Sequence, residues 1–376
     1  RRRARAGTIH LVTSQRRVYL HIGAPKTGTT YVQDRLSRNA KTLAQHGVHF
    51  PARAPLVSPG MFHFRAALDL LGQDWGGEQG HAEGSWDALV RRVRRSRGTV
   101  IVSHEILAPA PAQAVARAKA ELGAGDDLHV VYGVRDLARQ LPAAWQESIK
   151  QGRKWTYRNF LRKTRSGKPW FYRAFDVPAV LSTWSAGLPP ENVHVVTVPQ
   201  SGTAGPHELW HRFCRAVDID PAWAPEESRR TNPSLGVAEA ALIRRLNKRL
   251  GRRVRRDATY DDLVRGLLAE QELAGRESAK LLLPPGMHDW AEAESARWVE
   301  WIEQSGVDVI GDLEDLRPLP TRRRDYVNPD KVTSKAQLAA ALDALTVMTQ
   351  EAARRDDPEQ QLAQRLRTGV RRLRES

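Results

Sequence analysis

Residues 21–31 read His21-Ile22-Gly23-Ala24-Pro25-Lys26-Thr27-Gly28-Thr29-Thr30-Tyr31. An apolar, β-branched run at 18–22 ends directly before the first glycine, and apolar residues with helical spacing begin at Thr30. This pattern predicts a strand, a tight loop and a helix. Small residues let backbone N–H groups approach an anion, and a helix N-terminus adds a partial positive charge. The segment therefore predicts a phosphate-binding loop, in which Lys26 is a point charge and Thr29 and Thr30 donate hydroxyl groups.

Strands and helices alternate through the first half of the chain. Three further strand-like runs follow, at 99–102, 128–134 and 193–198, and helical periodicity occupies 30–45, 86–95, 112–122 and 143–152. This alternation predicts an α/β fold with a parallel sheet flanked by helices. Ligands of such sheets bind outside the carboxyl ends of the strands. We therefore expect one crevice, lined by residues 23–26, 103–105, 135–136 and 199–200.

The sequence predicts three segments: a basic N-terminal tail at 1–16, an α/β core at 17–235 and a mainly helical C-terminal extension at 236–376. Within the core, residues 51–85 are rich in Pro, Gly, His and aromatic residues and predict an irregular insertion. A second insertion, at 153–176, interleaves basic and aromatic residues. The extension is expected to contain helices at 239–250 and 336–353, and the latter carries Leu338, Leu342, Leu345 and Met348 on one face.

Composition limits the class of protein. The chain has 376 residues, a net charge of +16 and 41% hydrophobic residues, which is typical of a globular protein with anionic partners. Its single cysteine, Cys214, excludes an internal disulfide framework and a cysteine-based metal site. No apolar run reaches the ~18 residues of a membrane-spanning helix. The basic residues 1–5 precede no apolar stretch, so we expect no signal peptide and a cytoplasmic location.

The spacing of Gly23 and Gly28 also occurs in the loop of nucleoside-triphosphate enzymes. That motif requires a lysine directly after the second glycine, followed by a Ser or Thr that holds Mg²⁺. Here Thr29 stands at the lysine position, and the lysine, Lys26, comes earlier. An ATP or GTP enzyme would therefore lose its main phosphate contact. A plain strand–turn–helix connection is the structural alternative.

Residues Pro25-Lys26-Thr27-Gly28-Thr29-Thr30 resemble the 5′-phosphosulfate loop of sulfotransferases that use 3′-phosphoadenosine-5′-phosphosulfate (PAPS), in which Pro-Lys-Ser/Thr-Gly-Thr-Thr-Trp is typical. The resemblance covers about residues 17–235. It implies a P-loop-like fold, PAPS as cosubstrate, its desulfated product PAP, and no metal. It also implies that Lys26 contacts the 5′-phosphate and the bridging oxygen, that residues 28–30 hold the 5′-phosphate, and that Tyr31 replaces a tryptophan that stacks on adenine.

In this family an Arg after a strand and a Ser eight residues later bind the 3′-phosphate. Arg135 matches the first residue, but Ala143 stands at the serine position. Pro142 predicts the first turn of a new helix, whose N–H groups at Ala143 and the next residue would replace the hydroxyl. Alternatively, Arg135 only precedes an ordinary helix cap, Asp136.

Two further basic segments are candidates for phosphate contacts. Arg139 is a secondary candidate for the 3′-phosphate. The segment Arg229-Arg230-Thr231-Asn232-Pro233-Ser234-Leu235 resembles a basic loop of bacterial members, in which Arg230 and Asn232 would contact the cosubstrate. Equally, Asn232 or Ser234 would make an ordinary helix N-cap.

Sulfonate transfer to a hydroxyl or amine requires a base near the sulfate. The strand at 99–102 is followed by His104 and Glu105, and either can act as general base while the other orients it. We favour Glu105, because bacterial members often carry a glutamate at this strand end. A polar strand end without catalytic function is the alternative, and His49 and His63 are further candidates for the base.

The segment His207-Glu208-Leu209-Trp210-His211 matches the pattern of zinc proteases. No third ligand follows in a recognisable motif. Leu209, Trp210 and Phe213 instead describe an amphipathic helix after Pro206. We therefore predict no metal site here.

The expected function is a PAPS-dependent sulfotransferase that acts on a small-molecule, carbohydrate or lipid acceptor, with 51–85 and 153–176 as acceptor-side insertions. Two alternatives stay open. One is a divergent P-loop nucleotide kinase or NTPase, which would bind a nucleotide with Mg²⁺. The other is a non-catalytic protein that binds polyanions or nucleic acid, indicated by the net charge of +16 and by residues 153–176. Nucleic acid is not the partner that we favour.

Overall fold

A computed structural model describes residues 16–53, 58–75, 79–123, 127–200, 205–230 and 234–355. The chain divides into two compact units. The first contains the described residues of Arg1–Arg135, Arg173–Arg230 and Arg297–Leu316, and the second those of Asp136–Tyr172, Thr231–Ala296 and Arg317–Ser376. Each unit is therefore built from separate stretches of the sequence.

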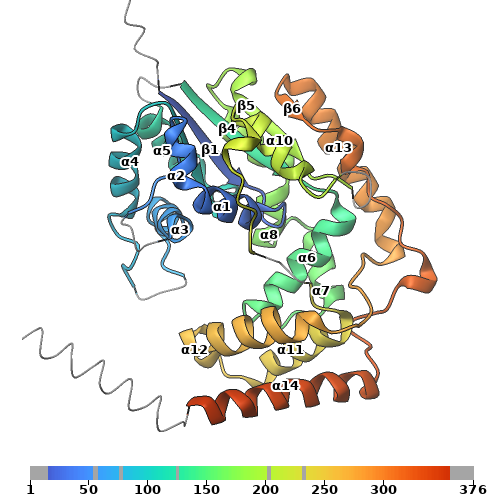
Figure 1. Cartoon of the computed structure of the whole chain (residues 1–376). Helices are drawn as coiled ribbons and strands as arrows, with labels where there is room; N and C mark the ends of the chain where they lie inside the picture. Colours follow the sequence, from blue (N-terminus) through green and yellow to red (C-terminus); the bar gives the residue numbers. More distant parts are fainter. Residues whose placement is uncertain are drawn as a thin grey trace, which may run out of the picture. The chain divides into compact units, whose positions relative to one another are not determined.

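The first unit contains a six-stranded, all-parallel sheet with the strand order β2-β3-β1-β4-β5-β6 (Figure 1). The strands are β1 (Arg17–Gly23), β2 (Val48–His49), β3 (Thr99–Ser103), β4 (Asp127–Val134), β5 (Val193–Thr197) and β6 (Asp308–Ile310). The predicted α/β class and its four strands are confirmed. After β1 the chain forms β2 at the edge of the sheet and then β3 beside β1, before it crosses to β4 on the other side. The carboxyl end of β1 therefore lies at a switch point, where ligands of such sheets bind.

Helices connect and flank the strands. The longer helices of the first unit are α1 (Thr29–Arg38), α2 (Ala40–Gln45), α3 (Pro59–Leu70), α4 (Ser85–Arg95), α5 (Ala112–Leu122), α9 (Val177–Ser185) and α10 (Glu208–Ala216). The short 3₁₀ helices of this unit are η1 (Glu105–Leu107), η2 (Pro190–Asn192), η3 (Pro221–Trp223) and η8 (Leu313–Leu316). Among all described residues, none of the helices combines the length and the apolar character needed to cross a bilayer.

The second unit is helical. Its elements are α6 (Leu137–Lys150), α7 (Tyr157–Thr164), α11 (Val237–Arg249), η4 (Val254–Arg256), α12 (Ala258–Tyr260), the π-helical η5 (Asp261–Glu272), η6 (Leu273–Gly275), η7 (Pro285–Met287), η9 (Arg323–Asp325) and α14 (Ser334–Arg355). Two helices, α8 (Trp170–Phe175) and α13 (His288–Ser305), contain residues of both units.

One face of the sheet carries the core of the first unit. Alternate residues of neighbouring strands, such as Tyr19, Ile101 and Val131, pack with apolar residues of α1 and α10 in one buried cluster. Trp210 of α10 is fully buried in this cluster. On α9, Trp184 is also fully buried, and its indole N–H lies 3.2 Å from the carbonyl of Leu107. Helix α10 therefore packs against the sheet, and α9 contacts the segment that follows β3.

Strand β6 completes the sheet from a distant part of the sequence. His194, Val195 and Val196 of β5 pair in register with residues 308–310. The ring of His194 also lies 2.7 Å from the carboxylate of Asp308. Sequence patterns did not predict β6, because three residues are too few to show a period of two.

Residues 51–85 are not the irregular insertion that the composition predicted. They contain helix α3, which has Pro59 at its start and buries Phe62, Ala66 and Leu70 at helical spacing. The predicted helix at 30–45 is also divided, because Asn39 separates α1 from α2. Its side-chain amide donates to the carbonyls of Arg35 and Glu226. Local side-chain hydrogen bonds of this kind compete with helix continuation.

The division into units also differs from the boundary expected at residue 235. Residues 136–172 group with the C-terminal helices, and residues 297–316, with β6, group with the sheet. The predicted helix at 336–353 lies within α14. However, Leu338, Leu342 and Leu345 are 62%, 55% and 63% exposed, so this apolar face is not packed in the core.

The loop between β1 and α1 is fixed to β4 at Gly133. The Ala24 N–H donates to the carbonyl of Gly133 at 3.0 Å, and the buried hydroxyl of Thr27 donates to the carbonyl of Ala24 at 2.7 Å. A Cβ at position 133 would lie 2.7 Å from the Thr27 hydroxyl oxygen. Glycine at this position therefore makes room for the side chain that folds the loop.

We predict that Gly133→Ala lowers the free energy of unfolding by about 1–3 kcal/mol, because the added methyl overpacks a buried site. Chemical denaturation measures the loss. The matched control is Gly251→Ala, whose added methyl would meet no atom within 4 Å. Equal stability of the two variants would contradict the close approach of Thr27 to β4.

Candidate functional site

The loop from Gly23 to Gly28 ends in an uncapped helix N-terminus. Gly28, the N-cap of α1, has φ +92°, and no side chain caps the helix. A Cβ on Gly28 would lie only 2.4 Å from a methyl carbon of Leu209, so both its conformation and its surroundings require glycine. The first N–H groups of a helix have no intrahelical acceptor. Those at Thr29 and Thr30 therefore provide donors for an anion.

Lys26 and Arg135 lie together at this loop. A guanidinium nitrogen of Arg135, directly after β4, donates to the backbone carbonyl of Lys26 at 3.1 Å. Lys26 is half-buried and has φ +67°. The two residues that the sequence assigned to separate phosphate contacts are thus joined by one hydrogen bond, and both bring positive charge to one end of the sheet.

Glu105 approaches the same loop from β3. A Cβ built on Gly23 would lie 3.4 Å from both Cα and Cβ of Glu105, so the two backbones are adjacent. Gln33 of α1 donates to the Glu105 carboxylate at 3.4 Å and to the Ser103 hydroxyl at 3.1 Å. The Ser103 hydroxyl in turn lies 2.8 Å from His21 Nδ1. A polar network therefore links the ends of β1 and β3 to α1.

The electrostatic surroundings keep Glu105 ionised. Burial alone would raise its pKa, but the interactions with His104, Lys26 and His21, together with a backbone hydrogen bond, outweigh burial and lower it. At neutral pH the carboxylate is therefore in the form that can accept a proton.

His104 is placed differently from its neighbour. Its Nδ1 accepts the N–H of Ile106 at 3.3 Å and so caps η1. Its ring lies 5.0 Å from that of Phe64, between ring centroids. Burial lowers its pKa, although Glu105 raises it. With Nδ1 occupied and a neutral ring, the proton is on Nε2, so His104 has no free nitrogen for general-base catalysis.

Neither further histidine candidate is suited to act as the base. His63 is 1% exposed, and its ring nitrogens contact the Pro51 carbonyl at 2.9 Å and the Ser103 N–H at 3.2 Å. Burial lowers its pKa to about 3. His49 lies on β2 and pairs with Val100, near the amino end of β3 and away from Glu105.

Tyr31 and the later basic loop both contact α1. The Tyr31 hydroxyl accepts a hydrogen bond from Arg35 at 3.1 Å, and its ring packs against the core cluster. The Arg229 N–H and the Ser228 hydroxyl donate to the Asp34 carboxylate at 2.9 and 2.8 Å. The loop that leads to exposed Arg230 is thus attached one turn beyond the phosphate loop. Asn232 lies outside the described residues.

Pro142 does not begin a new helix, so that prediction was wrong. Asp136 caps α6 by accepting the Arg139 N–H at 3.0 Å, and Pro142 lies inside that helix. The N–H groups of Ala143 and Ala144 therefore face the preceding turn, where helical hydrogen bonds form. Ala143 itself belongs to the second unit. The side chain of Arg139 pairs with Asp136.

The HExxH segment forms the N-terminal part of α10. His207 pairs with Glu227, and Glu208 pairs with Arg212. Among the residues that the structure describes, no group of three or more His, Cys, Asp or Glu side chains is arranged to hold a metal ion. Trp210 and Phe213 are buried, as the amphipathic pattern predicted.

Of the four strand ends at which the sequence predicted a crevice, those of β3 and β4 contact the loop after β1. Gln200, after β5, instead binds Asp315 through its backbone N–H and its side-chain amide. Sequence reasoning also missed Gln33 and Gly133. Gln33 lies one helical turn after Thr29 and Thr30, a spacing that places it on the face of those residues. Gly133 interrupts a β-branched run, which can indicate close approach of another backbone.

No family model, no curated protein and no solved structure matches this chain. The geometry of the site therefore stands on its own. It combines a helix N-terminus that no side chain caps, the cations Lys26 and Arg135, and an ionised carboxylate, Glu105. This set can hold a phosphate and accept a proton from a second molecule beside it.

We predict that the protein loses stability between pH 6.5 and pH 5. Burial lowers the pKa of His21 from 6.5 to about 4 and that of His63 to about 3. Below pH 6.5 the unfolded chain therefore binds more protons than the folded chain. Because of this difference, the free energy of unfolding decreases as the pH is lowered, by up to about 1.4 kcal/mol per pH unit for each histidine.

Urea denaturation at several pH values measures this slope. His63→Gln removes one of the titrating groups, so the variant should show a shallower slope over the same interval. A wild-type stability that is constant or rises on acidification from pH 6.5 to pH 5 would contradict the prediction.

Proposed function

We propose that the protein is a PAPS-dependent sulfotransferase with a P-loop-like fold. The observation that carries this proposal is the position of the Glu105 carboxylate beside the loop that contains Lys26. A site that only binds phosphate gains nothing from a carboxylate, which repels the ligand. A transferase gains a general base from the carboxylate, because its acceptor must lose a proton.

The residues fit the cosubstrate. The open N-terminus of α1 and Lys26 suit the 5′-phosphosulfate. Arg135 supplies a second cation from β4, where the resembling family binds the 3′-phosphate, and Arg230 a third from the loop attached to Asp34. Thr27 has a structural role, because its hydroxyl is bonded to the Ala24 carbonyl. Tyr31 keeps its ring beside α1, and its hydroxyl is held by Arg35.

The proposed reaction is an in-line displacement. The acceptor oxygen or nitrogen forms a bond to sulfur as the bond from sulfur to the 5′-phosphate oxygen breaks. Glu105 takes the acceptor proton, and Gln33 holds the carboxylate in place. Lys26 and the N–H groups of α1 stabilise the charge that returns to the phosphate. His104 caps η1 and so orients Glu105.

The kinase or NTPase alternative makes a different demand on the ligand. It requires Mg²⁺ and a lysine directly after Gly28, where Thr29 stands. Preference for PAP over ADP without metal therefore separates the two functions.

We expect PAP to raise the melting temperature more than AMP or ADP does in the absence of metal, because only PAP presents a phosphate to both cations. A ligand at 100 times its Kd stabilises the folded state by about 2.7 kcal/mol. Lys26→Asn should abolish the shift, since asparagine tolerates positive φ but carries no charge. Lys41→Asn, on an exposed position of α2, is the control. Equal shifts with AMP and PAP would remove the case for two phosphate sites.

We expect Glu105→Gln to lower kcat by ~10²–10⁴-fold, because a general base contributes that much. The amide keeps the shape and an acceptor for Gln33, so the variant should still fold. His104→Asn, which retains an acceptor for Ile106, should reduce kcat only a few-fold. Transfer of labelled sulfonate from PAPS to a panel of phenols, sugars and amines first supplies an acceptor. A Glu105→Gln enzyme with full activity would place the base elsewhere.

A further inference from the structure

Helix α7 of the second unit carries two arginines on one exposed face, and hydrogen bonds fix the start of the helix. The Thr156 hydroxyl accepts the N–H of Asn159 at 3.1 Å, and the Asp330 carboxylate accepts the N–H groups of Tyr157 and Arg158 at 3.0 and 2.9 Å. The helix start is therefore fixed. Arg158 and Arg162, one turn apart, lie on the same face. Both side chains are exposed.

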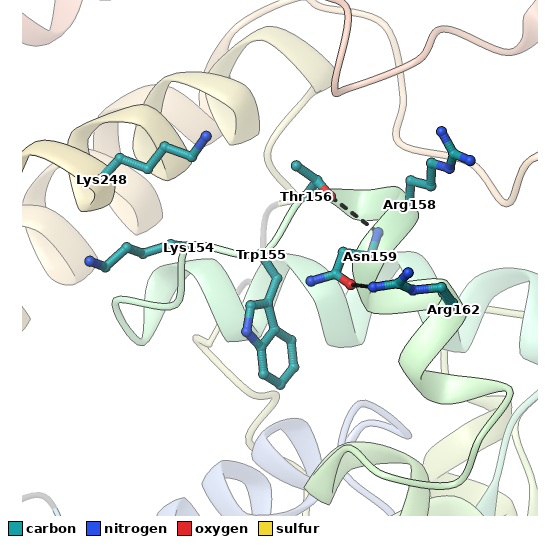
Figure 2. A pocket seen from close by; sticks show the side chains of 7 residues that line it. All are labelled: Lys154, Trp155, Thr156, Arg158, Asn159, Arg162 and Lys248. Atoms are coloured by element: carbon teal, nitrogen blue, oxygen red, sulfur yellow. Dashed lines mark hydrogen bonds between the residues drawn. The ribbon is translucent and has the colours of Figure 1, made fainter.

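Two lysines from distant segments meet beside this helix. Asn247 of α11 is fully buried, and its amide donates to the carbonyls of Ile149 and Arg153 at 2.7 and 3.0 Å. The next residues in the two segments are Lys248 and Lys154. In Figure 2 both side chains lie on the same side of Trp155, and their ammonium groups point in different directions. Both lysines line the same cavity as the arginines of α7.

A cavity of about 450 Å³ lies among these side chains. It is lined by Lys154, Trp155, Thr156, Arg158, Asn159, Arg162 and Lys248. In Figure 2 the two lysines lie on one side of Trp155 and the two arginines of α7 on the other. The lining thus contains four cationic side chains and no carboxylate, so it suits a ligand with several negative charges.

These charges have no internal counterions. Across the described ranges, no Asp or Glu forms an ion pair with Lys154, Arg158, Arg162 or Lys248. The side chain of Arg162 donates to an uncharged group, the amide oxygen of Asn159, at 2.8 Å. The four cations are therefore available to a ligand.

A second cavity, of about 570 Å³, continues the basic surface. It shares Arg158 and Arg162 with the first and adds Arg165, the residue directly after α7. Its carboxylate, Asp330, is already used by two backbone N–H groups of α7 and lies 3.9 Å from Arg244. Arg158 and Arg162 thus line both cavities.

We propose that this surface of the second unit is a binding site for a compact ring compound that carries several phosphate or sulfate groups. Each cavity has the volume of a small-molecule site, too small for a nucleic-acid duplex. Trp155 offers an aromatic edge to a ring, and its face is already approached by Lys163 at 5.2 Å. A single strand of nucleic acid binds by stacking successive bases and brings one charge per nucleotide, whereas four cations around one cavity match a more densely charged ligand.

Isothermal titration calorimetry of the full chain at constant salt tests this proposal, with phytate and sucrose octasulfate as probes. The tighter of the two identifies phosphate or sulfate as the preferred group. We expect Lys154→Gln/Lys248→Gln and Arg158→Gln/Arg162→Gln each to weaken binding at least tenfold. The control Arg91→Gln/Arg95→Gln removes the same charge from exposed positions of α4 and should change binding less than twofold.

Other outcomes overturn the proposal. An equal loss in the control variant would mean attraction by net charge alone, and equal affinity for inorganic phosphate would mean that no polyanion site exists. Tighter binding of an oligothymidylate, lost in the same site variants, would make this a nucleic-acid surface. Loss of phytate binding in Lys26→Asn would place the probe on the phosphate loop. If Lys26→Asn still binds phytate, the result for this surface is independent of the sulfotransferase proposal.

Discussion

The hydrogen bond from the Ala24 N–H to the Gly133 carbonyl fixes the loop on which the candidate site depends. It attaches the chain after β1 to the neighbouring strand β4, and the adjacent Arg135 adds a bond to the Lys26 carbonyl. Two contacts from one strand thus set the path of the loop before α1 begins. A loop on the surface of a parallel sheet would otherwise lose conformational entropy without compensation. Here the hydrogen bonds to Gly133 and from Arg135 compensate for the lost entropy.

Glu105 shows how burial and charge act against each other in the site. Burial favours the neutral acid, but His104, Lys26 and His21 favour the carboxylate, and their effect is larger. The outcome depends on the arrangement of β1 and β3, since His21 and Ser103 are paired residues of these strands. The hydrogen bonds of Gln33 then connect the carboxylate to α1. The protonation state of one side chain is therefore a property of the whole strand–loop–helix unit.

Much of this arrangement could be predicted from the sequence, because strands and loops leave local patterns. The four main strands, the loop at 23–28 and the positions of Lys26, Glu105 and Arg135 at strand ends all follow from β-branched runs and the residues after them. Long-range contacts leave no such pattern. Nothing in the sequence distinguishes Gln33 from other glutamines in helices, because its contact with Glu105 appears only in the structure. Pro142 predicted a helix start, although Asp136 had already capped α6. Helix α3 was not predicted, because the composition of residues 51–85 is typical of loops.

The pairing of β6 with β5 has a consequence for any shortened form of the protein. A chain that ends at residue 235 would lack residues 308–310, and β5 would become an open edge with His194, Val195 and Val196 unpaired. Exposed apolar edges of this kind recruit other strands and aggregate. The same holds during synthesis on the ribosome, where β5 emerges more than one hundred residues before its partner. Expression of the sheet as a contiguous N-terminal fragment should therefore yield insoluble protein, whereas in the full chain β6 covers β5.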